Sequence, residues 1–249
     1  MDTRVILITG ASRGIGAATA LLAAERGHAV AINYHASRDA ADALAERIER
    51  AGGTAMTVQA DVAVEDDVVR MFRAVDARFG RLDGLVNNAG ILERQMRLEQ
   101  MDAARLQRIL ATNVTGAFVC AREAVLRMST ARGGRGGAIV NVSSAAARLG
   151  SPNEYIDYAA SKAAIDTMTI GLAKEVGAEG IRVNAVRPGL IHTDIHASGG
   201  EPGRIERVKG AVPMQRGGTA EEVARAILWL LSDEASYVNG GILDVSGGR

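Results

Sequence analysis

The sequence predicts an α/β fold, in which one doubly wound, mostly parallel sheet of seven strands lies between layers of helices. Short β-branched segments alternate with longer alanine-rich segments of helical period along the whole chain, which is typical of such sheets. Hydrophobic residues make up 47% of the 249 residues but aromatic ones only 3%, so Ala, Val, Ile and Leu must build the core, as in buried parallel strands. No linker-like stretch divides the chain, so residues 1–249 are expected to form one domain.

The expected strands are short and bounded by turn residues. They cover residues 4–9, 28–33, 54–59, 82–87, 137–143, 181–186 and 241–245. Helices are expected at 14–27, 38–53, 65–80, about 100–130 and 155–178. Gly27 and Gly52 should end the first two helices in left-handed caps. A last helix should follow Thr219, where TAEE forms a capping box with Glu222.

Charge and apolar patterning narrow the class of partner. Lys plus Arg and Asp plus Glu balance at 29 each, so nothing electrostatic favours nucleic acid or an anionic membrane. No apolar run approaches the roughly 18 residues of a membrane span, and the start runs into a glycine turn without a signal peptide. The single Cys120 cannot form an intramolecular disulfide and, within GAFVCA, should be a small buried hydrophobe. A reducing, cytoplasmic location is expected.

A glycine turn, TGASRGIG at 9–16, directly follows the first strand and opens the first helix. Gly10, Gly14 and Gly16 allow a tight turn, a close approach of backbone to a pyrophosphate and close packing of helix on strand. The N-terminus of the helix offers free N–H groups and a positive dipole end to phosphate. The sequence therefore predicts a dinucleotide site here.

The turn is spaced G-x-x-x-G-x-G and resembles the first turn of the short-chain dehydrogenase/reductase family, which has a Rossmann-like domain. Further motifs of that family follow in order: NNAG at 87–90, Asn113 in ATNVTG, Ser143–Ser144, Tyr158-x-x-x-Lys162 and RPGLIHT at 187–193. Within the family, the chain is similar to 3-oxoacyl-carrier-protein reductases and glucose 1-dehydrogenase-like members. The resemblance implies hydride transfer between a nicotinamide coenzyme and a carbonyl or secondary alcohol.

Tyr158 and Lys162 lie four residues apart and so share one helix face, whereas Tyr155 has Ala159 at that offset. The resemblance implies a catalytic set of Asn113, Ser144, Tyr158 and Lys162. Tyr158 would be the general acid and base, its pKa lowered by the Lys162 ammonium and the positive nicotinamide ring.

The serine that polarises the substrate carbonyl is expected to be Ser144. Ser144 precedes Tyr158 by 14 positions, one more than the family's spacing, so Ser143 remains the alternative. Asn113 stands in mid-helix, where its propensity is poor, and would link through backbone and water to Lys162.

The coenzyme is expected to be NADP(H), with NAD(H) possible. The positions directly after Asn33, 34–38, hold no acidic residue to bind a ribose 2′-hydroxyl, and the nearest one, Asp39, already lies in the next helix. Arg13 and Arg38 are placed to hold a 2′-phosphate, although both could be solvated surface charges. Together with the resemblance, this gives the coenzyme-binding set Gly10, Ser12, Arg13, Gly14, Ile15, Gly16, Asn33, Tyr34, His35, Ser37, Arg38, Asp61, Val62, Asn88, Ala89, Gly90, Tyr158, Lys162, Pro188, Gly189, Ile191 and Thr193.

The substrate itself is not predicted. A loop at about 190–213 should shape the pocket together with 91–97 and 145–155. An acyl-carrier partner would need a basic rim, which could be formed by Arg94, Arg97, Arg204, Arg207 and Lys209 unless these are ordinary solvated charges. His192 and His196 have a metal-like spacing but no evident third ligand, so no metal is expected.

Two other functions fit the same fold. One is a nucleotide-binding sensor, against which all four catalytic positions argue; the other is an epimerase or dehydratase, against which length and the single domain argue. The C-terminal GGILDVSGG resembles a strand that packs at a subunit interface in relatives, so a homotetramer, or a dimer, is expected.

Overall fold

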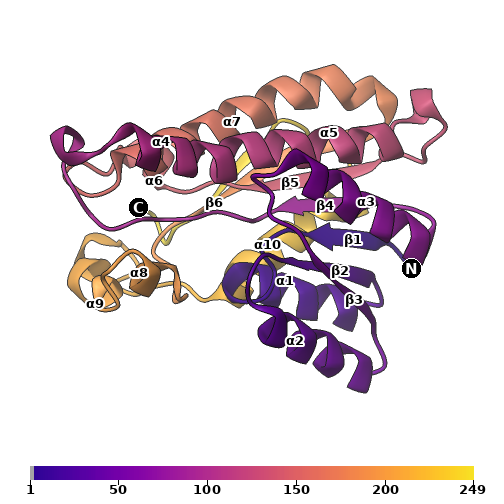
Figure 1. Cartoon of the computed structure of the whole chain (residues 1–249), viewed down its shortest axis with the longest axis horizontal. Helices are drawn as coiled ribbons and strands as arrows, with labels where there is room; N and C mark the ends of the chain where they lie inside the picture. The colour runs from indigo at the N-terminus through magenta and orange to yellow at the C-terminus, as the bar shows by residue number, and fades with distance from the viewer. Residues whose placement is uncertain (1–2) are drawn as a thin grey trace.

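The computed structural model describes residues 3–249, apart from the side chain of His196, and a seven-stranded parallel sheet forms its centre (Figure 1). The strands are β1 (Val5–Ile8), β2 (Ala29–Tyr34), β3 (Thr54–Gln59), β4 (Gly84–Asn87), β5 (Gly137–Val142), β6 (Ile181–Pro188) and β7 (Ile242–Val245). Their order is β3-β2-β1-β4-β5-β6-β7, and all pairs are parallel. The predicted fold class and all seven predicted strands are confirmed. The sheet is wholly, not mostly, parallel.

Alternation along each strand divides the core into two layers. Ile6 and Ile8 pack with α1 (Gly14–Glu25), α2 (Arg38–Arg50) and α10 (Ala220–Leu231). Val5 and Leu7 pack on the other face with α3 (Glu65–Phe79), α5 (Gly116–Met128) and α7 (Ile156–Val176). Figure 1 shows these two groups of helices on opposite sides of the sheet. Successive strand residues point to opposite faces, so a strand covered on both sides must be apolar throughout.

The local signals at the helix ends behave as predicted. Gly27 and Gly52 both have φ near +83°, a left-handed conformation that glycine adopts without steric cost. At the start of α10, the Thr219 hydroxyl accepts from the Glu222 backbone N–H, and the Glu222 carboxylate accepts from the Thr219 N–H. Both capping bonds of the box are therefore present.

The prediction of one helix over about 100–130 was wrong in detail. The segment consists of α4 (Ala103–Leu110), a π-helical turn (Ala111–Thr115) and α5. Such wide turns insert an extra residue into a helix and often occur at functional sites. This one carries Asn113, whose carboxamide both accepts from Ile91 N and donates to Ile91 O.

By length and composition alone, the helical stretch Ala103–Met128 could also cross a membrane, with a mean hydropathy of 1.3. A core helix passes the same test. Cys120, Ala124 and Met128 lie in the core against the sheet, and Cys120 is buried as predicted.

The strand order reverses between β1 and β4. The chain that leaves β1 and the chain that leaves β4 run to opposite sides of this point in the sheet. Ligands of such sheets bind at the carboxyl ends of the strands near this point. Three short helices that the sequence did not predict surround that end of the sheet: α6 (Ala146–Leu149), α8 (Ile195–Ser198) and α9 (Arg204–Val208). In Figure 1, α8 and α9 lie beyond the end of β6, close to the C-terminus.

Candidate functional site

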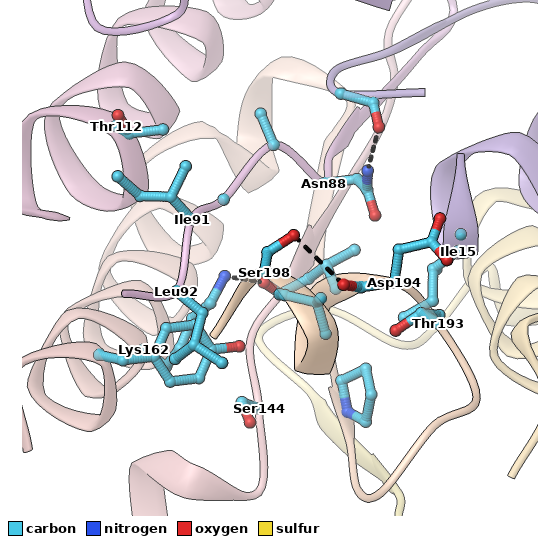
Figure 2. A pocket seen from close by; sticks show the side chains of 18 of the residues that line it. Ile15, Asn88, Ile91, Leu92, Thr112, Ser144, Lys162, Thr193, Asp194 and Ser198 are labelled. Carbon is cyan, nitrogen blue, oxygen red and sulfur yellow. Dashed lines mark hydrogen bonds between the residues drawn. The ribbon is translucent and has the colours of Figure 1, made fainter. Parts of the chain in front are cut away.

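A cavity of about 980 Å³ opens at the carboxyl ends of the strands. Its walls come from the segments that follow β1 to β6, so residues far apart in the sequence meet there. Figure 2 shows Lys162 and Ser144 facing the same space as Asn88, Ile15 and Thr193. The cavity is large enough for a dinucleotide together with a small molecule.

The glycine turn forms one end of this cavity. Gly10 has φ +60°, and a Cβ added to it would lie 2.9 Å from Cα of Ala89. A Cβ on Gly16 would lie 2.6 Å from Asn88 Nδ2, so this glycine serves close packing. Arg13 occupies the N-cap of α1, and no described side chain caps that helix end. The bare N–H groups and the glycine cradle fit a pyrophosphate.

Hydrogen bonds join the turn to the NNAG segment. The Asn88 carboxamide donates to Thr9 O at 2.8 Å and to Gly10 O at 3.0 Å. In return, the Thr9 hydroxyl accepts from the N–H groups of Asn88 and Ala89, both at 3.0 Å. Thr9 begins the TGASRGIG motif, but these contacts of its hydroxyl were not predicted from the sequence.

Asn33 is a buried linker rather than an open ligand. It accepts from Gly10 N at 3.0 Å and donates to Ala60 O at 3.1 Å, which fixes the turn against the ends of β2 and β3. His35 Nε2 lies 3.7 Å from Asp61 Oδ2, on the adenine side expected from the resemblance.

The two arginines predicted for a 2′-phosphate differ. Arg13 is exposed, lines the cavity, and makes no side-chain hydrogen bond or ion pair with the described part of the chain. Arg38 instead lies over the Tyr34 ring, 5.6 Å from its centroid, and donates to Gln59. Arg13 is therefore the better placed of the two.

Most of the predicted site residues line the cavity. Gly16, Arg38 and Asn113 are the ones that do not, among the described residues. Those that do are Gly10, Ser12, Arg13, Gly14, Ile15, Asn33, Tyr34, His35, Ser37, Asp61, Val62, Asn88, Ala89, Gly90, Ser144, Tyr158, Lys162, Pro188, Gly189, Ile191 and Thr193.

The two neighbouring serines make different contacts. The Ser143 hydroxyl is buried and donates to the Lys162 backbone O at 3.1 Å. The Ser144 side chain is less buried, accepts from Ala146 N at 3.1 Å, and lies close enough to the Tyr158 side chain to lower its pKa. This geometry favours Ser144 over Ser143 as the serine that meets a substrate.

Tyr158 and Lys162 occupy the same side of the cavity, with Lys162 Nζ 5.6 Å from the centroid of the Tyr158 ring. The expected lowering of the tyrosine pKa included the positive nicotinamide ring and stays a prediction. Burial raises the pKa of Tyr158, and only the nearby Ser144 side chain opposes this. Burial also lowers the pKa of Lys162 to about 8, partly offset by Asp166. Desolvation penalises both charged forms, so the protein's own charges do not produce a phenolate.

Lys162 is held by donating to Val142 O at 2.8 Å. Asn113 is buried and donates to Ser161 Oγ at 3.1 Å. A Cβ on Gly90 would lie 3.4 Å from Lys162 Nζ and 3.5 Å from Asn113 Oδ1. Asn113 therefore lies behind Gly90 and Lys162, and its link to the lysine through water stays a prediction.

Tyr155 has a different environment from Tyr158. It is buried at the start of α7, its hydroxyl reaches Gly199 O at 3.5 Å, and Arg204 lies over its ring at 5.0 Å. Its contacts are with the segment that carries α8 and α9.

The proposed basic rim is largely neutralised. Arg204 pairs with Glu154 and Glu201 at 2.5 and 3.2 Å, and Arg207 pairs with the same two carboxylates. Gln95 donates to Glu201 at 2.5 Å. Arg97 and Lys209 pair with Glu99 and Glu206, which leaves Arg94 without an ion pair among the described residues. These contacts join 91–97, 151–155 and 195–208 into one wall.

Several apolar side chains line the cavity beside polar ones such as Ser151, Glu154 and Ser198. The apolar lining residues include Ile91, Leu92, Leu149 and Ile195. They lie in the segments 91–97, 145–155 and 190–213, which were predicted to shape the pocket, but the individual residues were not predicted. Ordinary apolar loop residues carry no local signal that could have singled them out.

No group of three or more His, Cys, Asp or Glu among the described side chains could hold a metal ion. The side chain of His196 lies outside that description, so the absence of a metal remains a prediction.

Comparison with known proteins agrees with this geometry. The family model described as "Enoyl-(Acyl carrier protein) reductase" matches residues 10–249. "Uncharacterized oxidoreductase YgfF" of Escherichia coli (strain K12) is 60% identical, over 98% of this chain and 99% of its own. A 3-oxoacyl-[acyl-carrier-protein] reductase of Staphylococcus aureus (strain Mu50) is 38% identical, over 99% and 98%.

Among solved structures, a short-chain dehydrogenase/reductase from Serratia marcescens BCRC 10948 superposes with a TM-score of 0.91 at 34% identity, covering 98% of this chain and 97% of the other. The chain belongs to the short-chain dehydrogenase/reductase family. It is an oxidoreductase of that type, and the family uses NAD(P)(H).

Proposed function

We propose that the protein is an NADP(H)-dependent oxidoreductase that interconverts a carbonyl and a secondary alcohol, with Tyr158 as general acid and base. The observation that carries this proposal is the meeting of three groups in one cavity. Ser144 and Tyr158 both line the cavity, Ser144 lies close enough to lower the pKa of Tyr158, and the Lys162 ammonium lies beside the tyrosine ring. The glycine turn opens into the same cavity.

When bound, the nicotinamide coenzyme supplies or accepts the hydride. In reduction, the Ser144 hydroxyl holds the substrate oxygen by a hydrogen bond, and Tyr158 donates its proton to that oxygen. In oxidation, Tyr158 takes the proton back. Burial favours the neutral tyrosine, which is the form that donates. Lys162, fixed by Val142 O, faces the site where the nicotinamide ribose would be held.

The first experiment follows NADPH and NADH consumption against a panel of β-ketoacyl thioesters, diketones, quinones and ketosteroids, with sugar oxidation in reverse. Wild type is compared with Tyr158→Phe, and Tyr237→Phe, a fully exposed tyrosine, is the matched control. Turnover that disappears only in Tyr158→Phe supports the proposal. Tight NADPH binding without turnover on any substrate would instead favour the nucleotide-sensor alternative.

The preference for NADP(H) is supported by the lack of an acidic side chain at 34–38, directly after Asn33, and by Arg13, which lines the cavity and has no ion pair among residues 3–249 as described. Replacing Arg13 by Ala should weaken NADPH binding far more than NADH binding, because a forked charged contact to the 2′-phosphate is lost. Arg38→Ala should have the smaller effect, since Arg38 does not line the cavity. Equal losses for both coenzymes, measured by calorimetry, would refute the 2′-phosphate assignment.

We also propose a cytoplasmic homotetramer without nucleic acid or membrane partners. Support comes from exposed apolar side chains on two separate faces. Phe118 and Leu126 are 50% and 43% exposed on α5, and Leu243 is 38% exposed on the edge strand β7. Two such faces are what a closed tetramer needs. Light scattering tests the mass, and Phe118→Glu should halve it; a monomeric wild type would refute the proposal.

A further inference from the structure

A buried ion pair stands next to Tyr158, and no step above uses it. Asp157 precedes Tyr158 in the first turn of α7, and Arg105 reaches it from α4. Arg105 Nε lies 2.6 Å from Asp157 Oδ2, and Nη2 lies 3.3 Å from Oδ1. Only 4% and 2% of the two side chains are exposed. A buried ion pair gives little more net stability than apolar side chains packed in the same place. Stability alone therefore does not explain why Arg105 and Asp157 are paired here.

The pair holds two parts of the cavity at once. The third donor of the guanidinium, Nη1, bonds the backbone O of Arg94 at 2.6 Å. Asp157 Oδ1 accepts from the backbone N–H of Tyr158 at 2.9 Å. One planar fork therefore connects the 91–97 segment to the residue that carries the phenol, and the fixed geometry of arginine makes all three contacts possible together.

The position of α4 is fixed in turn. Asp102 caps this helix by accepting from the backbone N–H of Arg105 at 2.7 Å. Ile91 and Leu92, at the start of the bonded segment, line the cavity beside Lys162 in Figure 2. A shift of the Arg105 side chain would therefore move the first turn of α7 relative to the cavity-lining residues Ile91 and Leu92.

We propose that Arg105 and Asp157 are positioning residues, which fix the backbone of Tyr158 relative to the segment 91–94. The phenol of Tyr158 is thereby held where it meets the substrate oxygen at hydrogen-bond distance. This inference rests on the proposed function, because it assigns the pair to the reaction of Tyr158. Proton transfer needs a separation within hydrogen-bond reach, so a small displacement reduces turnover while the glycine turn, on other elements, still binds the coenzyme.

The test compares Arg105→Met with Arg127→Met. Arg127 on α5 also bridges two carboxylates, those of Asp76 on α3 and Glu123 on α5, and is only 18% exposed. Like Arg105 it does not line the cavity, but none of its partners adjoins Tyr158. Arg105→Met should lower kcat by about 10- to 100-fold with NADPH affinity unchanged, whereas Arg127→Met should keep the wild-type kcat. A folded Arg105→Met with the wild-type kcat would overturn the proposal.

Two further measurements keep the test decisive. If Arg105→Met does not fold, Arg105→Lys replaces it, because one ammonium cannot hold both Asp157 oxygens and Arg94 O; a wild-type kcat there overturns the proposal. In the Arg105 variant, hydrogen exchange of the backbone amides of Tyr158 and residues 91–94 should be faster than in wild type, with β4 as the internal reference. Unchanged protection of these amides also overturns the proposal. If wild type reduces no carbonyl, the proposed function fails by itself, and amide exchange still decides the positioning role.

Discussion

Replacing Lys162 by Met should remove a pH-dependent cost to folding. The lysine is 4% exposed, and burial lowers its pKa from 10.5 to about 8. The difference, 10.5 − 8 = 2.5 pKa units, corresponds at about 1.36 kcal/mol per unit to roughly 3 kcal/mol by which burial disfavours the charged form. Such a cost is common where a site is built for reaction rather than stability.

The sign of the pH dependence follows from the direction of the shift. Below pH 8 the lysine is protonated in both the folded and the unfolded protein, so the full cost is present. Between pH 8 and 10.5 the unfolded chain still binds the proton and the folded protein does not, so stability rises with pH. Above 10.5 the cost is gone.

Urea unfolding of wild type and Lys162→Met, followed by circular dichroism from pH 7 to 10.5, measures this effect. The free energy of unfolding of the variant minus that of wild type should fall by roughly 3 kcal/mol over the range. Lys174 is an exposed lysine of the same helix, and the variant Lys174→Met is the control for the effect on stability of removing any lysine. A difference that stays constant with pH would show that the Lys162 ammonium is not desolvated.

Three further outcomes follow from single contacts. Cys120, whose pKa burial raises to about 12, should resist thiol reagents until urea unfolds the protein; rapid labelling of the folded chain would contradict this. Arg204→Met loses charged hydrogen bonds worth about 2 kcal/mol, so amide exchange across 195–208 should quicken roughly 30-fold; unchanged exchange would mean that Arg207 suffices. Tyr155→Phe should keep most turnover, because its hydroxyl only reaches Gly199 at 3.5 Å; a collapse would give Tyr155 the chemistry.

Local patterns predicted most of the fold. The β-branched runs gave the strands, and Gly27, Gly52 and the Thr219 box gave three helix ends, because each depends on residues within a few positions. The π-helical turn at Ala111–Thr115 could not be predicted, since it depends on the bonds of Asn113 with Ile91, which lies 22 residues away.

The candidate site was predictable where a short motif carries the function and not where long-range contacts decide it. The glycine turn, Tyr158 and Lys162 all line the cavity, and their roles there stay predictions. The rise that burial alone gives the Tyr158 pKa could not be predicted, because it depends on how much protein surrounds the ring. The pairing of Arg204 and Arg207 was likewise left open: Glu201 is a near neighbour in the sequence, but their second partner, Glu154, lies about 50 residues earlier in the chain.

The wall formed by 91–97, 151–155 and 195–208 has a consequence for how this protein can diverge. The ion pairs of Arg204 and Arg207 and the hydrogen bond from Gln95 to Glu201 are made among side chains of these three segments, and none of them involves the glycine turn. Substitutions that remodel this wall can therefore accumulate in the later part of the chain while residues 9–16 stay unchanged. A descendant of this sequence can therefore change the shape of one side of the cavity by altering three segments and keep the glycine turn on the other side intact.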